Sequence, residues 1–240
     1  MKIVDYKPLT LIDYPNKVAS IGFTSGCDLR CPYCHNPSLV LSDQSDGVDL
    51  TESFLFYLRQ RKDLLDGVVI SGGEPLLHKD IEFLLLSIKK LGLMIKLDTN
   101  GNHPVLLKKL LDNRMIDHVA LDHKNIEKKI AMTCGLTIAR HIKDYRINWK
   151  ASIENLRNSE IEYEIRTTIV KEFHDIKNLR EMANMLRSNE IWYLQNFRRS
   201  KELLVDRLVV NDQSLTGFSN NELSEMIIDI QKVHEKTFVR

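Results

Sequence analysis

Three cysteines, Cys27, Cys31 and Cys34, lie within eight residues in the spacing C-x3-C-x2-C. The apolar run 18–24 before them predicts a short buried strand, and the Ser-Gly pair after this run predicts a loop. A closed structural zinc or iron–sulfur site takes four protein ligands, so three thiolates leave one metal position open for chemistry. The spacing therefore predicts a single metal centre that can bind a further molecule at its open position.

Two other interpretations of these cysteines stay open on spacing alone, namely a zinc site and surface thiols. Zinc would need a fourth ligand, which His35 or the distant Cys134 could supply. A second C-x2-C pair would favour zinc, and the chain has none. Iron–sulfur ligation is therefore favoured, and Cys134 is expected to be a small, partly buried residue rather than a ligand.

The elements that must position the cysteines alternate between strands and helices, which predicts βαβ units and a mainly parallel sheet. The predicted strands are 18–24, 67–71, 93–97, 118–121, 163–170 and 191–194. The predicted helices are 51–58, 81–91, 105–111, 176–186 and 222–233. A complete eight-fold barrel usually takes about 250 residues with every unit present. Six units therefore predict an α/β fold of the incomplete (β/α)6 TIM-like barrel type, open on one side, with a doubly wound sheet as the alternative.

Composition limits the class of protein. The 240 residues are 43% hydrophobic, which suits one sizeable core, and without a linker or repeat we expect a single domain, residues 1–240. Lys and Arg number 34 against 33 acidic residues, and this balance argues against nucleic-acid binding. Four cysteines, three of them clustered, favour a metal site in a reducing compartment. Without a long apolar segment, we expect a soluble, cytoplasmic protein with no membrane partner.

Polar or glycine-rich segments follow four consecutive predicted strands, and the carboxyl ends of parallel strands meet at one edge of a sheet. After the cysteine loop come Gly72, Gly73 and Glu74, then the segment 98–101, then the segment 122–124. The glycines would let the backbone approach a ligand closely. Asp98 and Asp122 end neighbouring strands, where two carboxylates could share a cation or bind an amine, although capping a helix is the commoner role of such an Asp.

With these motifs, the chain resembles the radical S-adenosylmethionine (SAM) enzymes. In that family, the C-x3-C-x2-C loop holds a 4Fe–4S cluster whose open iron binds the amine and carboxylate of SAM. The Gly-Gly-Glu-Pro at 72–75 resembles the family motif for the methionine amine. The segments 97–101 and 121–124 resemble those of glycyl-radical-enzyme activating enzymes, in which the second contacts SAM. In some of these relatives the two aspartates hold SAM through a monovalent cation.

A narrower resemblance, to the activating proteins of anaerobic ribonucleoside-triphosphate reductase, rests on four segments, which are 9–15, 31–37, 66–75 and 166–170. Two departures from that pattern occur. Relatives often continue the fifth strand with Val-Pro-Gly, where this chain has Val170-Lys-Glu-Phe-His174. In addition, His123 occupies a position that is more usually apolar.

The resemblance implies an oxidoreductase with one 4Fe–4S cluster on Cys27, Cys31 and Cys34, and with no catalytic residue beyond the cluster and SAM. It also implies a glycyl-radical enzyme as protein substrate, most closely anaerobic ribonucleotide reductase, and flavodoxin or a ferredoxin-type protein as electron donor. The alternatives are a small-molecule enzyme such as 7-carboxy-7-deazaguanine synthase and a non-catalytic zinc-binding interaction protein. The predicted SAM-binding set is Tyr33, Cys34, His35, Gly72, Gly73, Glu74, Asp98, Asn100, Asp122, His123, Lys124, Arg166 and Gln195.

Overall fold

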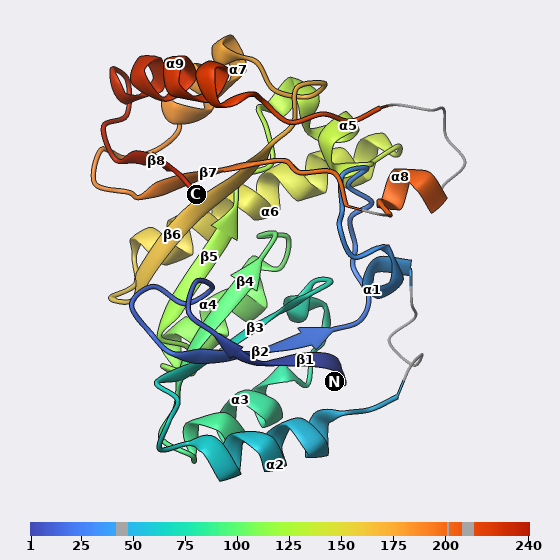
Figure 1. The fold of residues 1–240 in the computed structure, drawn as a ribbon, viewed down its shortest axis with the longest axis vertical. Helices are drawn as coiled ribbons and strands as arrows, with labels where there is room; N and C mark the ends of the chain where they lie inside the picture. Colours follow the sequence, from blue (N-terminus) through green and yellow to red (C-terminus); the bar gives the residue numbers. More distant parts are fainter. Residues whose placement is uncertain (42–47, 201, 208–213) are drawn as a thin grey trace. The chain divides into compact units, whose positions relative to one another are not determined.

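The computed structural model of this chain describes residues 1–41, 48–200, 202–207 and 214–240. Its eight described strands follow one another along the sheet in chain order, from β1 to β8 (Figure 1). The chain divides into two compact units. The first unit consists of residues 1–28, 38–120 and 147–162, and the second consists of residues 29–37, 121–146 and 163–240.

The first unit contains the strands that follow the amino terminus. Strand β1 pairs antiparallel with β2, whereas β2, β3 and β4 pair in parallel. The bounds are Ile3–Thr10 for β1, Ala19–Thr24 for β2, Gly67–Gly72 for β3, Met94–Thr99 for β4 and His118–Asp122 for β5, which begins in this unit. Strands β2 and β3 are buried along most of their length, and neither contains a charged residue.

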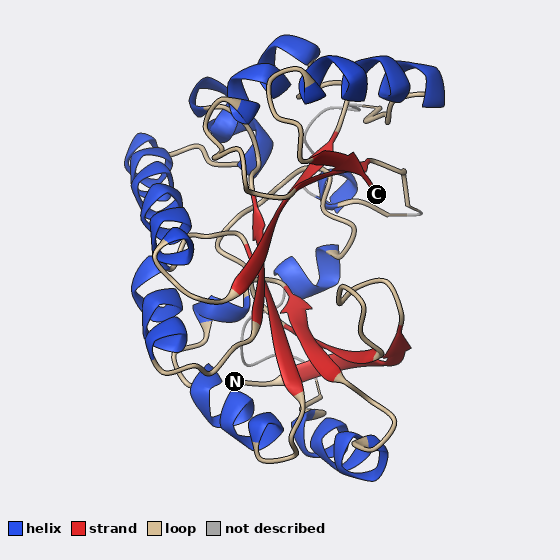
Figure 2. Cartoon of the chain, turned by 90° about the vertical axis from the view of Figure 1, so that its left-hand side faces the viewer, coloured by secondary structure: helices blue, strands red, loops and turns tan. Residues whose placement is uncertain are grey.

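Helices pack beside the strands (Figure 2). Among them, α2 contacts β1 and α3 contacts β4. Helix α3 buries Ile81, Leu84, Leu85 and Ile88, which is the spacing of one helix face. The bounds are Pro37–Leu41 for α1, Thr51–Arg61 for α2, Pro75–Leu77 for the 3-10 helix η1, Ile81–Lys89 for α3 and Pro104–Asp112 for α4. The long helix α6, Ala139–Arg157, starts in the second unit and ends in the first.

In the second unit, β6, β7 and β8 pair in parallel. Helices α7 and α9 lie side by side, and α9 also packs against β8 (Figure 1). Ser219 and Glu222 form a capping box that fixes the start of α9. The bounds are Glu127–Lys129 for η2, Ile130–Cys134 for α5, Glu162–Ile169 for β6, Ile176–Ala183 for α7, Trp192–Asn196 for β7, Leu204–Arg207 for α8, Asn220–Gln231 for α9 and Thr237–Val239 for β8.

The sequence prediction of an α/β fold with a mainly parallel sheet is confirmed. The six predicted strands correspond to β2–β7, and the five predicted helices correspond to α2, α3, α4, α7 and α9. Strands β1 and β8 and helices α1, α5, α6 and α8 were not predicted. The single domain over residues 1–240 stays a prediction. None of the described helices is both long enough and apolar enough to cross a lipid bilayer.

Candidate functional site

In the first unit, the end of β3 lies directly against the loop that leads to the first cysteine. The N–H of Gly73 donates to the carbonyl of Thr24 at 2.9 Å, and the N–H of Glu74 donates to that of Gly26 at 2.8 Å. A Cβ atom on Gly73 would lie 1.9 Å from the Gly26 oxygen. At Gly72, where φ is +119°, a Cβ atom would lie 2.4 Å from the Thr24 nitrogen. The glycine pair is therefore required for contact with protein backbone, whatever ligand it also approaches.

Glu74 is buried and uses both carboxylate oxygens within the protein. Its Oε1 accepts from the N–H of Leu76 at 3.0 Å and from the Thr99 hydroxyl at 2.8 Å, and its Oε2 accepts from the N–H of Asn100 at 2.7 Å. Burial, followed by the nearby charge of Asp28, raises the pKa of Glu74 to about 7. Glu74 thus joins the end of β3 to the end of β4, and its contacts within this unit are those of a positioning residue.

Asp28, the residue after Cys27, is the acceptor of a polar cluster that the sequence analysis missed. Asn100 donates to its Oδ1 at 2.8 Å, Asn102 donates to its Oδ2, and His103 Nε2 lies 3.1 Å from Oδ2. Burial raises the pKa of Asp28, but the hydrogen bonds from His103, Asn102 and Asn100 outweigh it and leave the pKa below its usual value. Three side chains after β4 therefore hold the backbone next to Cys27.

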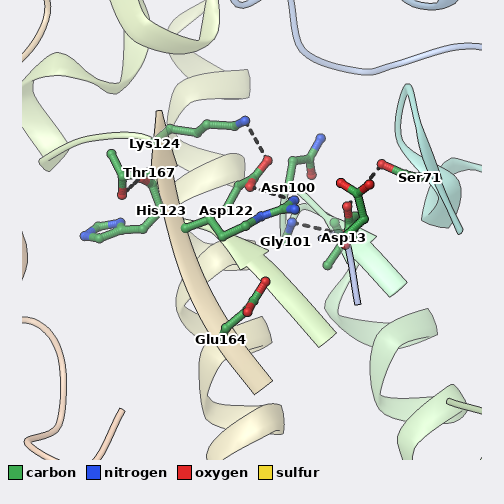
Figure 3. Close-up of polar contacts among 12 residues, drawn as sticks. Asp13, Ser71, Asn100, Gly101, Asp122, His123, Lys124, Glu164 and Thr167 are labelled. Carbon is green, nitrogen blue, oxygen red and sulfur yellow. Dashed lines mark hydrogen bonds and ion pairs between the residues drawn. The ribbon is translucent and has the colours of Figure 1, made fainter. Parts of the chain in front are cut away.

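Asp98 lies at the end of β4 with a lysine that the sequence analysis also missed. The ammonium of Lys96 is 3.9 Å from Asp98 Oδ1, and the hydroxyl of Ser71 donates to Oδ2 at 3.2 Å (Figure 3). The side chain of Lys96 is fully buried, whereas that of Asp98 is 12% exposed. A buried lysine in the middle of a strand is unusual, because charged side chains are rarely buried without a partner. The sequence feature that indicates this pair is a lysine two residues before Asp98.

In the second unit, Asp122 at the end of β5 is paired with two cations. Lys124 Nζ lies 2.8 Å from its Oδ2, and Arg166 Nη2 on β6 lies 3.2 Å from its Oδ1 (Figure 3). Burial raises the pKa of Asp122, but Lys124 and Arg166 outweigh it, so the pKa is lowered and the carboxylate stays ionised. The carboxylate partner that an interior Arg166 requires is therefore Asp122.

The second and third cysteines also lie in the second unit. The N–H of Cys34 donates to the carbonyl of Cys31 at 3.0 Å, and the Cys34 carbonyl accepts from Leu204 of α8. A hydrogen bond with the buried Cys134 lowers the pKa of Cys31 to about 7, against the opposing effect of burial. The thiolate is the metal-binding form of cysteine, so this environment favours ligation by Cys31.

Three further predicted SAM-binding residues lie in this unit. Tyr33 is buried with its ring 5.9 Å from that of Phe173, and His35 is exposed with its ring 5.4 Å from that of Phe197. Burial raises the pKa of Tyr33, and the partial desolvation of the His35 ring lowers the pKa of that histidine. Gln195 is half-buried on β7, in register with a threonine of β6. Their contacts with SAM remain predictions.

The two departures from the family pattern lie close together. His174 Nε2 is 2.9 Å from the carbonyl of Lys124, so this histidine holds the 122–124 segment from the β6–α7 loop. His123 is buried with its ring 6.4 Å from that of Trp192, and its carbonyl accepts from Thr167 (Figure 3). Burial lowers the pKa of His123 to about 3, so its ring is neutral. Within the unit, His123 therefore has the contacts of a core residue, and its predicted role towards SAM stays a prediction.

The donor chemistry of the cysteine loop fits an iron–sulfur cluster with one open iron. The candidate ligands are the three thiols of the loop. The fourth cysteine, Cys134, interacts with Cys31 inside the second unit. Cys27 belongs to the first unit, whereas Cys31 and Cys34 belong to the second. Among the described residues, no three His, Cys, Asp or Glu side chains are grouped as a site for a single metal ion. Three soft sulfur donors on one short loop are typical of cluster ligation.

Comparisons with known proteins agree with this donor set. Residues 21–186 match the family model of the radical SAM superfamily. A protein of Methanocaldococcus jannaschii assigned as a glycyl-radical enzyme activating enzyme is 33% identical over 194 residues, which cover 79% of this chain and 77% of that protein. The pyruvate formate-lyase-activating enzyme of Clostridium pasteurianum is 29% identical over 198 residues, covering 78% of this chain and 76% of that enzyme.

A solved structure has a similar fold. The crystal structure of a radical SAM methyltransferase from Sphaerobacter thermophilus superimposes with a TM-score of 0.73 at 13% identity, covering 97% of this chain and 68% of that one. The family model and the sequence relatives together place the chain in a class: it belongs to the radical SAM superfamily. Members of this superfamily bind a 4Fe–4S cluster and SAM. The two sequence relatives described above carry names of activating enzymes for glycyl-radical enzymes.

Proposed function

We propose that this chain is an activase that installs a glycyl radical on a partner enzyme, most closely an anaerobic ribonucleoside-triphosphate reductase. The observation that carries the proposal is the similarity to activating enzymes over more than three quarters of both chains, with 77% of the archaeal relative covered. A match limited to a shared SAM-binding core would not indicate which substrate the chain acts on.

Cys27, Cys31 and Cys34 are the proposed cluster ligands. A cluster bound there would supply the one electron needed to break the sulfonium C–S bond of SAM, so that the adenosyl part of SAM could take a hydrogen atom from the target. The products are methionine, 5′-deoxyadenosine and a carbon radical on the target. The electron comes from an external donor, for which we propose flavodoxin or a ferredoxin-type protein.

The residues of the second unit suit the charges of SAM. Asp122 is a fixed carboxylate at the end of β5, and Lys124 beside it is a fixed ammonium. Burial lowers the pKa of Lys124, but the charge of Asp122 outweighs it and raises the pKa well above its usual value. The methionine part of SAM carries an ammonium and a carboxylate, so Asp122 can pair with the ammonium while Lys124 or Arg166 pairs with the carboxylate.

We propose a glycine of a partner protein as the hydrogen donor for two reasons, which are the cysteine content of this chain and its similarity to activating enzymes. Radical SAM enzymes with auxiliary clusters need several additional cysteines, and this chain has only Cys134 beyond the C-x3-C-x2-C loop. Cys134 is fully buried. The choice of ribonucleotide reductase rests on the resemblance of the segments 9–15, 31–37, 66–75 and 166–170 to its activating proteins.

The test is electron paramagnetic resonance on the reconstituted chain mixed with the candidate reductase, SAM and a reductant under anaerobic conditions. We expect a glycyl radical signal that requires SAM and is lost when the radical-site glycine of the reductase is changed to alanine. The alanine variant should still allow the activase to bind SAM. A chain that binds SAM but produces no radical on any glycyl-radical enzyme, while consuming a purine precursor, would contradict the proposal.

A further inference from the structure

Lys96 lies in the first unit and has no role in the proposed function. Its side chain is fully buried on β4, and its ammonium donates to the backbone carbonyl of Asp13 at 2.7 Å. On its other side it lies 3.9 Å from the carboxylate of Asp98. Because side chains two residues apart point to the same face of a strand, the spacing of Lys96 and Asp98 fixes this pair.

The same spacing occurs at Asp122 in the second unit. There the lysine follows the aspartate by two residues, and Lys124 Nζ lies 2.8 Å from the carboxylate. Each of the two aspartates for which the sequence suggested a shared cation therefore has an ammonium of the protein beside it within its own unit. A carboxylate that already faces a buried ammonium attracts a second cation much less strongly, because the two positive charges repel each other in a medium of low dielectric constant.

We propose that the ammonium of Lys96 is the resident cation of Asp98, so that this chain binds SAM without a monovalent metal ion. In this role Lys96 is a positioning residue that acts through Asp98. Its charge faces Oδ1 at 3.9 Å, while the Ser71 hydroxyl donates to Oδ2 at 3.2 Å. The carboxylate is then a fixed acceptor at the end of β4. The inference rests on the SAM site of the proposed function and is independent of the identity of the partner enzyme.

A simpler role for Lys96 is to anchor the segment between β1 and β2. Its bond to the Asp13 carbonyl does this, and Tyr14, which is buried beside the ring of His118, does so too. An anchor of that kind would not make SAM binding depend on the cation in the buffer. Dependence on monovalent cations therefore distinguishes a charge-compensating role from a purely structural one.

The experiment measures SAM binding by calorimetry on the cluster-loaded chain, without turnover, in potassium, sodium or tetramethylammonium chloride at one ionic strength. Tetramethylammonium is too large to replace an ammonium group in a buried site. For the wild-type chain we expect the dissociation constant to vary by less than about twofold among the salts. For Lys96→Met we expect binding weaker by about tenfold or more in tetramethylammonium, with recovery in potassium.

The matched control is Lys89→Met, which removes a half-buried lysine of the same unit from its pair with Asp117 at 2.5 Å. We expect this variant to bind SAM as the wild type does in every salt. Wild-type binding that requires potassium would overturn the inference, and so would a Lys96→Met defect that potassium does not relieve. If Lys96→Met does not fold, the wild-type salt series alone decides. Absence of SAM binding in every salt would instead overturn the SAM site itself.

Discussion

The buried thiol of Cys134 interacts with that of Cys31, the middle cysteine of the C-x3-C-x2-C loop, and this interaction lowers the pKa of Cys31. The backbone reinforces this contact, because the N–H of Arg30 donates to the Cys134 carbonyl at 2.9 Å. Gly135, with φ of +64°, lies so close that a Cβ atom there would be 2.0 Å from the Arg30 oxygen. The end of α5 therefore supports the cysteine loop through backbone contacts and through one buried thiol.

The first prediction is that Cys134 supports the loop without ligating the cluster. Anaerobic reconstitution should give about four iron and four sulfide per chain in both the wild type and Cys134→Ser, because serine keeps a small hydrogen-bonding group in that place. Cys31→Ser is the matched variant across the same contact and should lose the cluster. Loss of iron from Cys134→Ser would show that three cysteines are not a sufficient ligand set.

The second prediction concerns the contact of Gly73 with the cysteine loop. Gly73→Ala should destabilise the chain by about 2 kcal/mol or more, because its Cβ atom would lie 1.9 Å from the Gly26 oxygen. Urea unfolding of the cluster-free chain measures this. The control is Gly92→Ala, where φ is +79° but no atom lies within 4 Å of the added carbon, so a loss of only about 1 kcal/mol is expected. Equal losses would argue against the close packing of β3 on the loop.

This contact also changes how the glycine motif is tested. If the glycines served only the close approach of a ligand, a larger residue at Gly73 would weaken ligand binding and leave the cluster intact. Because the added carbon would displace Gly26, next to Cys27, the cluster is expected to be disturbed as well. Substitutions in the second unit therefore separate SAM binding from cluster binding more cleanly.

The third prediction is that Asp122→Asn keeps the cluster and loses SAM binding. Iron content should be unchanged, whereas the dissociation constant for SAM should rise about tenfold or more with the loss of a charged partner. The apo chain should lose on the order of 3 kcal/mol, because Lys124 and Arg166 are left mostly buried without their anion.

The control for Asp122→Asn is Asp112→Asn, which breaks an exposed pair with Lys108 at 2.9 Å. Exposed pairs contribute little to stability, so this variant should match the wild type in iron content, SAM affinity and stability. SAM affinity that is equal in the two variants would remove Asp122 from the cofactor site.

The fourth prediction is a pH dependence of stability that arises from Glu74. Its pKa is raised in the folded chain from 4.5 to about 7, so between these values the folded state binds more protons than the unfolded state. The stabilising contribution is present below about pH 4.5 and is lost as the pH rises through 7, a change on the order of 3 kcal/mol. Urea unfolding of the cluster-free chain at pH 5 and pH 8 should show this loss, and Glu74→Gln should reduce it. Identical pH dependence in the two chains would contradict the assignment.

Much of the fold could be predicted because its strands are short apolar runs that end at glycine or aspartate. Helix α6 was missed because its 19 residues are mostly polar. Only one stripe of it, Tyr145, Trp149, Ile153 and Leu156, is buried and apolar. Strand β1 was missed because it is an edge strand with exposed alternate residues and a proline.

The candidate site was predicted where its chemistry lies in contiguous motifs, such as the three cysteines and the segments after β3, β4 and β5. Lys96 was missed because a lysine within an apolar strand normally faces solvent, and only the tertiary structure shows that it is buried. His103 was missed because its partner, Asp28, is 75 residues away in the chain and belongs to a different loop. Long-range pairs of this kind leave no local pattern in a single sequence.

The central claim is that the radical made from SAM ends on a glycine of a partner protein. The most direct measurement is the amount of 5′-deoxyadenosine formed per partner polypeptide, followed together with the glycyl radical signal over time. The account predicts about one 5′-deoxyadenosine per radical formed, after which cleavage stops because the radical is stored on the partner. Sustained cleavage of SAM over many turnovers, with a small-molecule product and no radical on any partner, would contradict it.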